Sequence, residues 1–492
     1  MNATHAATDS PATTRAWYAN RWVCLFAWSL VIFALVSGVV GGLWRGLNDQ
    51  PDWRAFVKET SFVWAQREIA PWTGMFGYLP GASFLLWPFT VWLPKPVGLI
   101  AFVALNGAAA VAATWLLFRY WFQANDEARP TPPRIALFGW PLFVLGAHFQ
   151  NVLQGNQLTI FLLFLCVCGL TFIQKARPVF GGFLLGVAGC LKVTPALLVV
   201  FLLLKRRWLA VLGMVLAFLL IDVIPSIAFF GFGGAVREHR AWLDRVGWYS
   251  NRRFIEDPWL RVMHHGHEHN TSLAVVLTRW LREQPGDGRH VVVRSDPPVD
   301  ALKRIRAELR AGDHLSIDPM PEPGGSWSVS YHDAATREML PRFSVASWSA
   351  NRVWLLWLMI EVIIVATAIW RTAIELPGNT PATKWQCDAA LWLLISLWPS
   401  PMLRDYYLPL ALPAAIVVWR TLLDLSPAAR RSPSAIAAAI SLVLCFVSVL
   451  SLASDFAEWY GIHLAALAGL TLATLWCSRT FVQITSPPVA SP

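Results

Sequence analysis

The chain has 492 residues, of which 56% are hydrophobic, 13% aromatic and 14% charged, and its mean hydropathy is +0.48. This composition excludes a soluble globular protein and predicts a polytopic α-helical membrane protein. The net charge of +10 does not indicate a nucleic-acid partner, because the basic residues stand at the ends of apolar runs, as the positive-inside rule expects.

Residues 1–21 are expected to form a flexible cytoplasmic tail. The apolar run 22–44 is too long for a signal-peptide core, so we expect it to remain as the first transmembrane helix. Arginines precede this run and acidic residues follow it, which places loop 45–77 on the extracytoplasmic side. Within the loop, apolar residues from Trp53 to Trp64 recur at helical spacing, which predicts a helix lying on the membrane surface.

Further apolar runs predict the other spans, so that about twelve spans result and both termini are cytoplasmic. In chain order these runs are 82–93, 97–120, 135–149, 158–173, 180–204, 208–230, 353–370, 391–398, 406–419, 435–452 and 464–476. The chain thus divides into a transmembrane module over 22–230, an extracytoplasmic loop over 231–349, C-terminal transmembrane helices over 350–480 and a tail over 481–492.

The long loop contains a hydrophilic segment, 283–342, that predicts a fold of its own. Its run Val291–Val293 is strand-like, Val299–Arg310 is helix-like and Trp327–Tyr331 is again strand-like. We therefore expect a small extracytoplasmic α+β insert.

The stretch 154–208 contains polar and basic residues between long apolar runs. Lys192 is flanked by apolar residues on both sides, and an ionisable group at membrane depth costs several kcal/mol unless it is paired or hydrated. Pro195 marks a broken helix, which membranes tolerate beside protein or a cavity. Lys192 is therefore expected to have a partner or to face a wet cavity; the alternative is a kinked helix whose lysine reaches a headgroup.

Two topologies of the run 180–204 fit the sequence. One long kinked crossing would place Lys175 outside the cytoplasm. A hairpin with Lys192 at its apex would leave both basic breaks, 175–177 and 205–207, in the cytoplasm and would require another segment to be re-entrant.

Several short motifs follow one another in a fixed order from Asp52 to Pro413. They are Asp52 with Phe56, Tyr78-Leu79-Pro80, Gly155-Asn156-Gln157, Gly182 and Gly186 with Ala188, Lys192 and Pro195, Asn270-Thr271-Ser272-Leu273 with Arg279, and Ser400-Pro401 with Pro409. By these motifs the chain resembles glycosyltransferase family 87, the polyprenyl-phosphate-mannose-dependent mannosyltransferases of the GT-C class. The run that ends on Lys192 and Pro195 is the most specific of them.

The sequence departs from the family pattern at two places. A single proline follows Leu79, where the family has a Tyr-Pro-Pro-like motif. The usual histidine near the end falls in Arg404-Asp405-Tyr406-Tyr407. This second departure leaves the donor sugar and the residue that supports the base undecided.

The resemblance implies a GT-C-like bundle in an integral membrane protein, expected in a bacterial plasma (inner) membrane with its active site on the extracytoplasmic face. It implies transfer of a hexose, with mannose expected, from a polyprenyl-phosphate sugar to a hydroxyl of a glycolipid or glycan acceptor, with inversion. The phosphate is already a good leaving group, so no metal and no other cofactor is expected.

Such a transfer needs a base for the acceptor proton and cations for the departing phosphate. Asp52 is the expected base, with Asp49 as a competitor and helix capping as an alternative role. Lys192, Arg404 and Arg279 are the expected phosphate ligands. The expected substrate-binding residues are Tyr78, Asn156, Gln157, Asn270, Ser272, Asp405, Tyr406 and Tyr407.

Several of these residues also have simpler interpretations. Asn156 and Gln157 have the character of helix-capping residues. The run 270–272 matches a glycosylation acceptor, and Arg404 beside Asp405 would form an interfacial ion pair.

Two other classes of function, a metal site and a transporter, fit the sequence less well. The tract 264–269 is rich in histidine, but such tracts in loops often bind nothing selectively, and the loops contain no cysteine pair, so we expect no metal centre. A transporter or lipid-carrier flippase is the alternative to an enzyme and would predict paired broken helices in both halves. The sequence shows one broken helix, around Lys192, and no second copy.

Overall fold

The computed structural model describes part of the chain. The described residues are 20–48, 51–67, 78–123, 132–249, 272–281, 315–316, 330–331, 346–374, 381–400, 405–448 and 461–485. Six helices in this part are long and apolar enough to cross a membrane, and five shorter apolar helices of 10–17 residues accompany them. The predicted class, an all-α membrane protein, agrees with this architecture, whereas the expected number of about twelve spans stays a prediction.

The helices mostly follow the predicted apolar runs, whereas α15 begins well before the run predicted over 391–398 and α10 continues well past residue 230. They are α1 (Arg21–Leu47), α2 (Pro51–Gln66), α3 (Pro80–Trp87), η3 (Pro88–Trp92), α4 (Lys95–Leu116), η4 (Leu117–Phe122), α5 (Pro132–Gln154), α6 (Thr159–Gln174), α7 (Pro178–Leu191), η5 (Thr194–Leu197), α8 (Leu198–Leu204), α9 (Trp208–Phe218), η6 (Leu219–Val223), α10 (Ile224–Tyr249), α12 (Leu273–Leu281), α14 (Ala350–Ala373), α15 (Pro381–Ile395), η8 (Asp405–Ala411), α16 (Leu412–Asp424), η9 (Ala429–Arg431), α17 (Pro433–Val447) and α19 (Ile462–Thr485).

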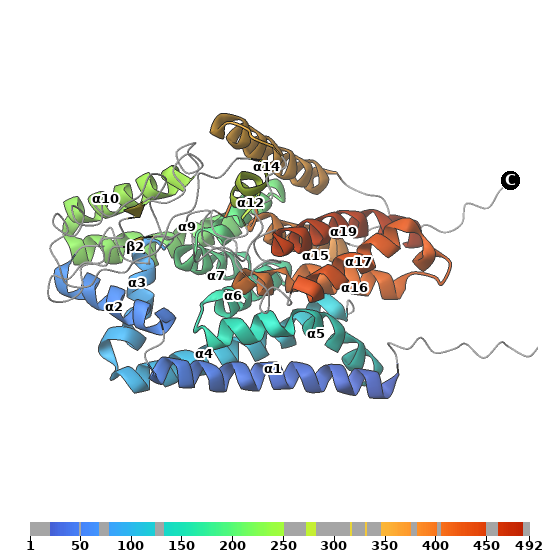
Figure 1. Cartoon of the computed structure of the whole chain (residues 1–492), viewed down its shortest axis with the longest axis horizontal. Helices are drawn as coiled ribbons and strands as arrows, with labels where there is room; N and C mark the ends of the chain where they lie inside the picture. The colour runs from blue at the N-terminus through green and yellow to red at the C-terminus, as the bar shows by residue number, and fades with distance from the viewer. Residues whose placement is uncertain are drawn as a thin grey trace, which may run out of the picture.

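Helix α1 forms one side of the bundle, where it packs on α5 and α4 (Figure 1). Its inner face carries small residues, and a Cβ atom at Gly42 would collide with the carbonyl oxygen of Leu153 in α5. Its outer face exposes large apolar side chains such as Phe26 and Phe33. Because such a surface is unfavourable in water, α1 has the one-sided character of a helix that faces lipid.

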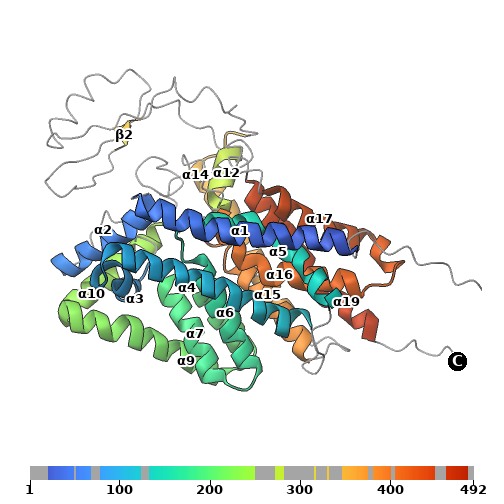
Figure 2. The same ribbon diagram turned by 90° about the horizontal axis from the view of Figure 1, so that it is seen from below.

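Helices α6, α7 and α9 lie side by side, at the lower edge of the molecule in Figure 2. The glycines of the most specific sequence motif make this close packing possible, because Gly182 faces the backbone of Ala210, and Gly186 faces Met214 and Ala217. A side chain at either glycine would overlap backbone atoms of α9. Small residues four positions apart are the usual means by which membrane helices approach each other closely.

The run 180–204 is a hairpin. Residues along α7 meet residues along α9 in the same order, so these two helices run in the same direction and α8 returns between them. Lys175 lies 3.9 Å from the ring centroid of Tyr120, whose carbonyl accepts a hydrogen bond from Gln386. Lys205 forms an ion pair with the nearby Asp388 at 2.6 Å. Both basic breaks therefore lie at the same end of the bundle, and Lys192 lies at the apex between them.

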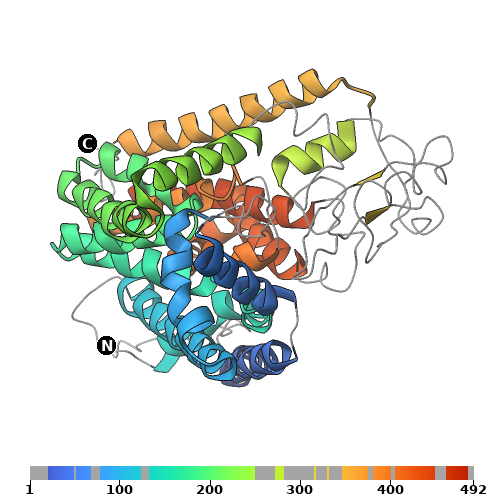
Figure 3. The same ribbon diagram turned by 90° about the vertical axis from the view of Figure 1, so that its left-hand side faces the viewer.

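The C-terminal helices α15, α16, α17 and α19 pack against one another, on the right in Figure 1. Buried Arg420 of α16 donates hydrogen bonds to the carbonyl oxygen of Trp121 at 2.7 Å and to the side chain of Gln386 at 2.8 Å. Trp419 donates to the carbonyl oxygen of Leu137. These bonds join α16 to η4, α5 and α15, while α14 lies on the side opposite α1 (Figure 3).

The expected insert over 283–342 is described at two strands only. Leu315–Ser316 (β1) pairs antiparallel with Ser330–Tyr331 (β2), and β2 lies within the strand that the sequence predicts over 327–331. The strand expected over 291–293, the helix over 299–310 and the histidine tract over 264–269 lie outside the described residues.

Candidate functional site

Lys192 stands where α7 ends and the chain reverses. Its backbone is extended, with φ −154° and ψ 128°, and its N–H still bonds to Ala188 O at 2.9 Å. Pro195 then lies in the short 3-10 helix η5, because its ring does not permit the α-helix to continue. The broken helix predicted from the sequence is therefore present, and it places Lys192 at a half-buried bend rather than along a helix.

Three tyrosines surround the Lys192 ammonium group. Its Nζ atom lies 3.7 Å from the ring centroid of Tyr407, 5.4 Å from that of Tyr406 and 5.9 Å from that of Tyr78. A cation within about 6 Å of an aromatic face is attracted by the ring quadrupole. We call these four residues the Lys192 cluster. The cluster brings together the motifs of Tyr78, Lys192 and Tyr406-Tyr407. We expect the contacts with the three rings to help stabilise the lysine at membrane depth.

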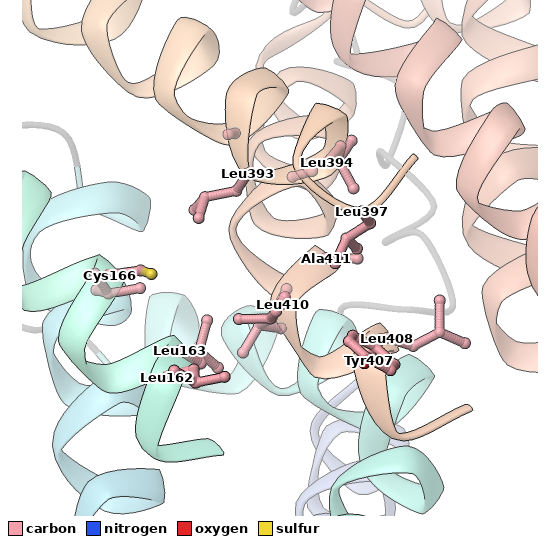
Figure 4. Close-up of a cluster of buried hydrophobic side chains, with 14 of the residues drawn as sticks. Leu162, Leu163, Cys166, Leu393, Leu394, Leu397, Tyr407, Leu408, Leu410 and Ala411 are labelled. Atoms are coloured by element: carbon pink, nitrogen blue, oxygen red, sulfur yellow. The ribbon is translucent and has the colours of Figure 1, made fainter. Parts of the chain in front are cut away.

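The two adjacent tyrosines are held by η8, which packs into the apolar core. Their rings are stacked, with centroids 4.8 Å apart and an interplanar angle of 27°. The following residues Leu408, Leu410 and Ala411 are at most 1% exposed, and they belong to one buried apolar cluster with residues of α6 and α15 (Figure 4). This burial anchors η8 and so fixes the wall of the cluster.

The third tyrosine is held from the side of α2. The ring of Phe56 meets that of Tyr78 edge-on, with centroids 6.2 Å apart, and Trp53 packs on Phe102 of α4 at 5.3 Å. Helix α2 was expected to lie on the membrane surface. Its face with Trp53 and Phe56 instead packs on protein, because α4 and Tyr78 offer an aromatic surface, while Trp64 is 44% exposed.

The expected base, Asp52, is the second residue of α2. It lies one helical turn before Phe56, which contacts Tyr78, which in turn contacts Lys192. The fold therefore brings the N-terminal turn of α2 to the Lys192 cluster. The side chain of Asp52 and all of Asp49 lie outside the described residues, so the role of Asp52 stays a prediction.

The Gly-Asn-Gln turn connects α5 to α6. Asn156 has a left-handed backbone with φ 53°, a conformation that asparagine tolerates better than most residues, and its side-chain amide donates to the carbonyl oxygen of Gly42 at 3.0 Å. Gln157 bonds through its N–H to Val152 O. These contacts favour the helix-ending role, and substrate binding by either residue stays a prediction.

The remaining predicted residues are not brought to the cluster by any described contact. Ser272 is buried at the start of α12, and its carbonyl oxygen accepts the N–H of Val276. Arg279 lies in α12 and Asp405 begins η8, but their side chains lie outside the described residues, as do Asn270 and Arg404. Their roles stay predictions.

One residue near the cluster was missed from the sequence. Asp222 is fully buried in η6 and bonds to Gly81 and His239. The signal that indicates it is a lone carboxylate within the apolar run 208–230, which at membrane depth requires a partner.

The site offers a cation held in an aromatic enclosure at a break between helices. Such a cation suits a single anionic group, and the aromatic rings suit a sugar face or an apolar tail. Among the described residues, no group of three or more His, Cys, Asp and Glu residues is arranged to hold a metal ion.

Comparison with known proteins gives one match. The model of glycosyltransferase family 87 matches residues 76–293, a segment that contains Tyr78, Lys192 and Asp222. No curated protein and no solved structure matches the chain.

Proposed function

We propose that the chain, whose residues 76–293 match glycosyltransferase family 87, is a membrane glycosyltransferase of that family and takes a hexose from a polyprenyl-phosphate sugar. Mannose is the first candidate for the sugar, and the acceptor is a hydroxyl of a glycolipid or glycan. The transporter alternative is set aside, because the matched family is one of enzymes.

The observation that carries the proposal is the enclosure of Lys192 by three tyrosines. A lysine ammonium is a compact point charge with three donors, and the tyrosine rings attract the same cation without neutralising it. Lys192 is therefore the cation of this cluster that we assign to the donor phosphate. When the bond between the anomeric carbon and the phosphate oxygen breaks, negative charge grows on that phosphate and the nearby cation stabilises it.

The acceptor side of the reaction is assigned to α2. The acceptor hydroxyl attacks the anomeric carbon from the face opposite the phosphate, and its proton passes to the carboxylate of Asp52. A single displacement of this kind inverts the anomeric configuration. The contacts from Phe56 through Tyr78 to Lys192 support this assignment, because they hold the first turn of α2 beside Lys192, the cation assigned to the phosphate.

The donor class is tested with the purified protein. Radiolabelled polyprenyl-phosphate mannose, glucose and arabinose are incubated separately with a membrane lipid extract, and transfer of label to the acceptor is measured. We expect transfer from the mannose donor. Transfer from none of the three, with a folded protein, would contradict the polyprenyl-phosphate assignment.

We further propose that the Lys192 cluster opens to the extracytoplasmic side, because the basic breaks around Lys175 and Lys205 lie at the other end of the bundle and positive loops remain in the cytoplasm. A phosphatase that folds only outside the cytoplasm is expected to be active when fused within 283–342. The same phosphatase inserted at 205–207 is expected to be inactive. The reverse pattern would invert the proposed orientation.

A further inference from the structure

Asp222 is a buried carboxylate whose two oxygen atoms both have partners. It is 0% exposed and lies in the π-helical segment η6, between α9 and α10. Its Oδ1 atom accepts a hydrogen bond from the N–H of Gly81, and its Oδ2 atom lies 2.8 Å from Nε2 of His239. Asp222 is fully buried and each of its oxygens has a protein partner, so its described contacts are all with the protein itself.

The bond to Gly81 caps helix α3. Gly81 is the second residue of α3, and the residue that precedes the helix, Leu79, makes no side-chain capping bond. The first N–H groups of a helix need acceptors and favour a nearby negative charge. Asp222 supplies both, although it lies 141 positions away in the sequence. It therefore caps α3 from a distant part of the same chain.

Only glycine leaves room for this capping bond. A Cβ atom at position 81 would lie 2.8 Å from Cα, Cβ and Oδ1 of Asp222, which is closer than such atoms approach in proteins. This contact gives a physical reason for the glycine that follows the single proline, where the sequence departs from the family pattern.

His239 holds the same carboxylate from α10. Its Nδ1 atom lies 2.8 Å from the carbonyl oxygen of Ala235. Both ring nitrogens thus lie within hydrogen-bond distance of an oxygen atom, one of Ala235 and one of Asp222. The chain reaches this position through Gly231, whose φ of +74° is open to glycine with little strain. The pair therefore binds the second half of α10 to η6 and α3.

We propose that Asp222 and His239 are positioning residues for the donor site, because they fix the start of α3 and with it Tyr78, three residues before Gly81. Tyr78 is the cluster residue that contacts both Lys192 and the α2 side of the site. If the cap is lost, the start of α3 is free to shift and the third wall of the cluster moves. This inference rests on the proposed function for its ligand but not for its geometry.

The geometry is tested without any ligand by the rate at which a maleimide labels the Tyr78→Cys variant. The seven native cysteines are buried and give a slow background. Asp222→Leu, which removes both bonds, is expected to change the labelling rate by about fivefold or more. Loss of a cap destabilises a helix end by roughly 1 kcal/mol, which corresponds to about a fivefold change in an equilibrium constant. Asp222→Asn keeps an oxygen for Gly81 and is expected to recover most of the native rate. The matched control is Glu361→Gln, which alters a carboxyl of α14 that accepts from Trp357 and is expected to change nothing.

The effect on the site is measured as the dissociation constant of farnesyl phosphate, a short polyprenyl phosphate. In the chain with native Tyr78, Asp222→Leu is expected to weaken binding by about five- to tenfold. The double variant with Tyr78→Ala is expected to bind no more weakly than Tyr78→Ala alone, because both changes act through the same ring. If Asp222→Leu does not fold, His239→Gln is used with the same criteria.

Unchanged labelling at position 78 would overturn the positioning role. So would a double variant whose loss of binding equals the sum of the losses in Asp222→Leu and Tyr78→Ala. Changed labelling together with farnesyl phosphate binding that is unaffected by Lys192→Met would leave the positioning intact and overturn the proposed donor site instead.

Discussion

Asp52→Asn is expected to lower the turnover rate by ~10²–10⁴-fold, the usual contribution of a general base, with little change in donor affinity. Asparagine has the size and hydrogen-bonding capacity of aspartate but does not accept a proton at neutral pH. At the second position of α2, loss of the negative charge costs the helix about 0.3–1 kcal/mol, so the fold is expected to survive. Initial rates and the donor dissociation constant of the purified variant check this prediction.

Asp49→Asn is the matched control for Asp52→Asn. It removes an equivalent charge from the same loop and is expected to reduce turnover much less. If the two variants exchange their behaviour, Asp49 is the base; if both remain fully active, the chemistry takes place away from the start of α2.

Lys192→Met is expected to weaken binding of the phosphate-bearing donor by about 10–150-fold, which corresponds to the ~1.5–3 kcal/mol of a hydrogen bond to a charged group. The fold is expected to remain intact, because the apolar side chain carries no desolvation cost and its thioether makes favourable contacts with the rings of Tyr406 and Tyr407. Binding of labelled polyprenyl phosphate, with thermal unfolding as the measure of stability, checks the result.

The chain offers a close control in Lys175. Its Nζ atom also lies over a tyrosine ring, that of Tyr120, at 3.9 Å, but at the opposite end of the bundle. Lys175→Met removes the same kind of cation–π contact and is expected to leave donor binding unchanged. Equal losses in the two variants would show that the lysine–tyrosine contact supports the fold only, and normal turnover by Lys192→Met would remove the phosphate role.

The two variants separate two parts of the same reaction. Asp52→Asn is expected to affect the chemical step, and Lys192→Met is expected to affect the binding of the donor and the stabilisation of its phosphate. A variant that carries both changes is expected to lose activity to background, since no described residue of the Lys192 cluster other than Lys192 is a cation.

The sequence by itself determined the helical membrane class, the positions of most helices and the break at Lys192. These features are local: the length of an apolar run decides whether it can span a bilayer, and a proline three residues after a lysine breaks its own helix. The helical spacing from Trp53 to Trp64 likewise predicted α2. The same local argument indicated that Lys192 needs a partner, although it did not indicate which one.

Only the tertiary structure decided what lies around Lys192. Tyr78 and Tyr406 are more than 300 positions apart in the sequence, and Gly81 and Asp222 are 141 apart. Such contacts depend on how closely whole helices approach, which here is set by glycines such as Gly182 against α9. That close approach also selected the hairpin over the single crossing. Which residue contacts a lysine at membrane depth depends on how the helices pack. The periodicity of a single segment does not indicate that residue.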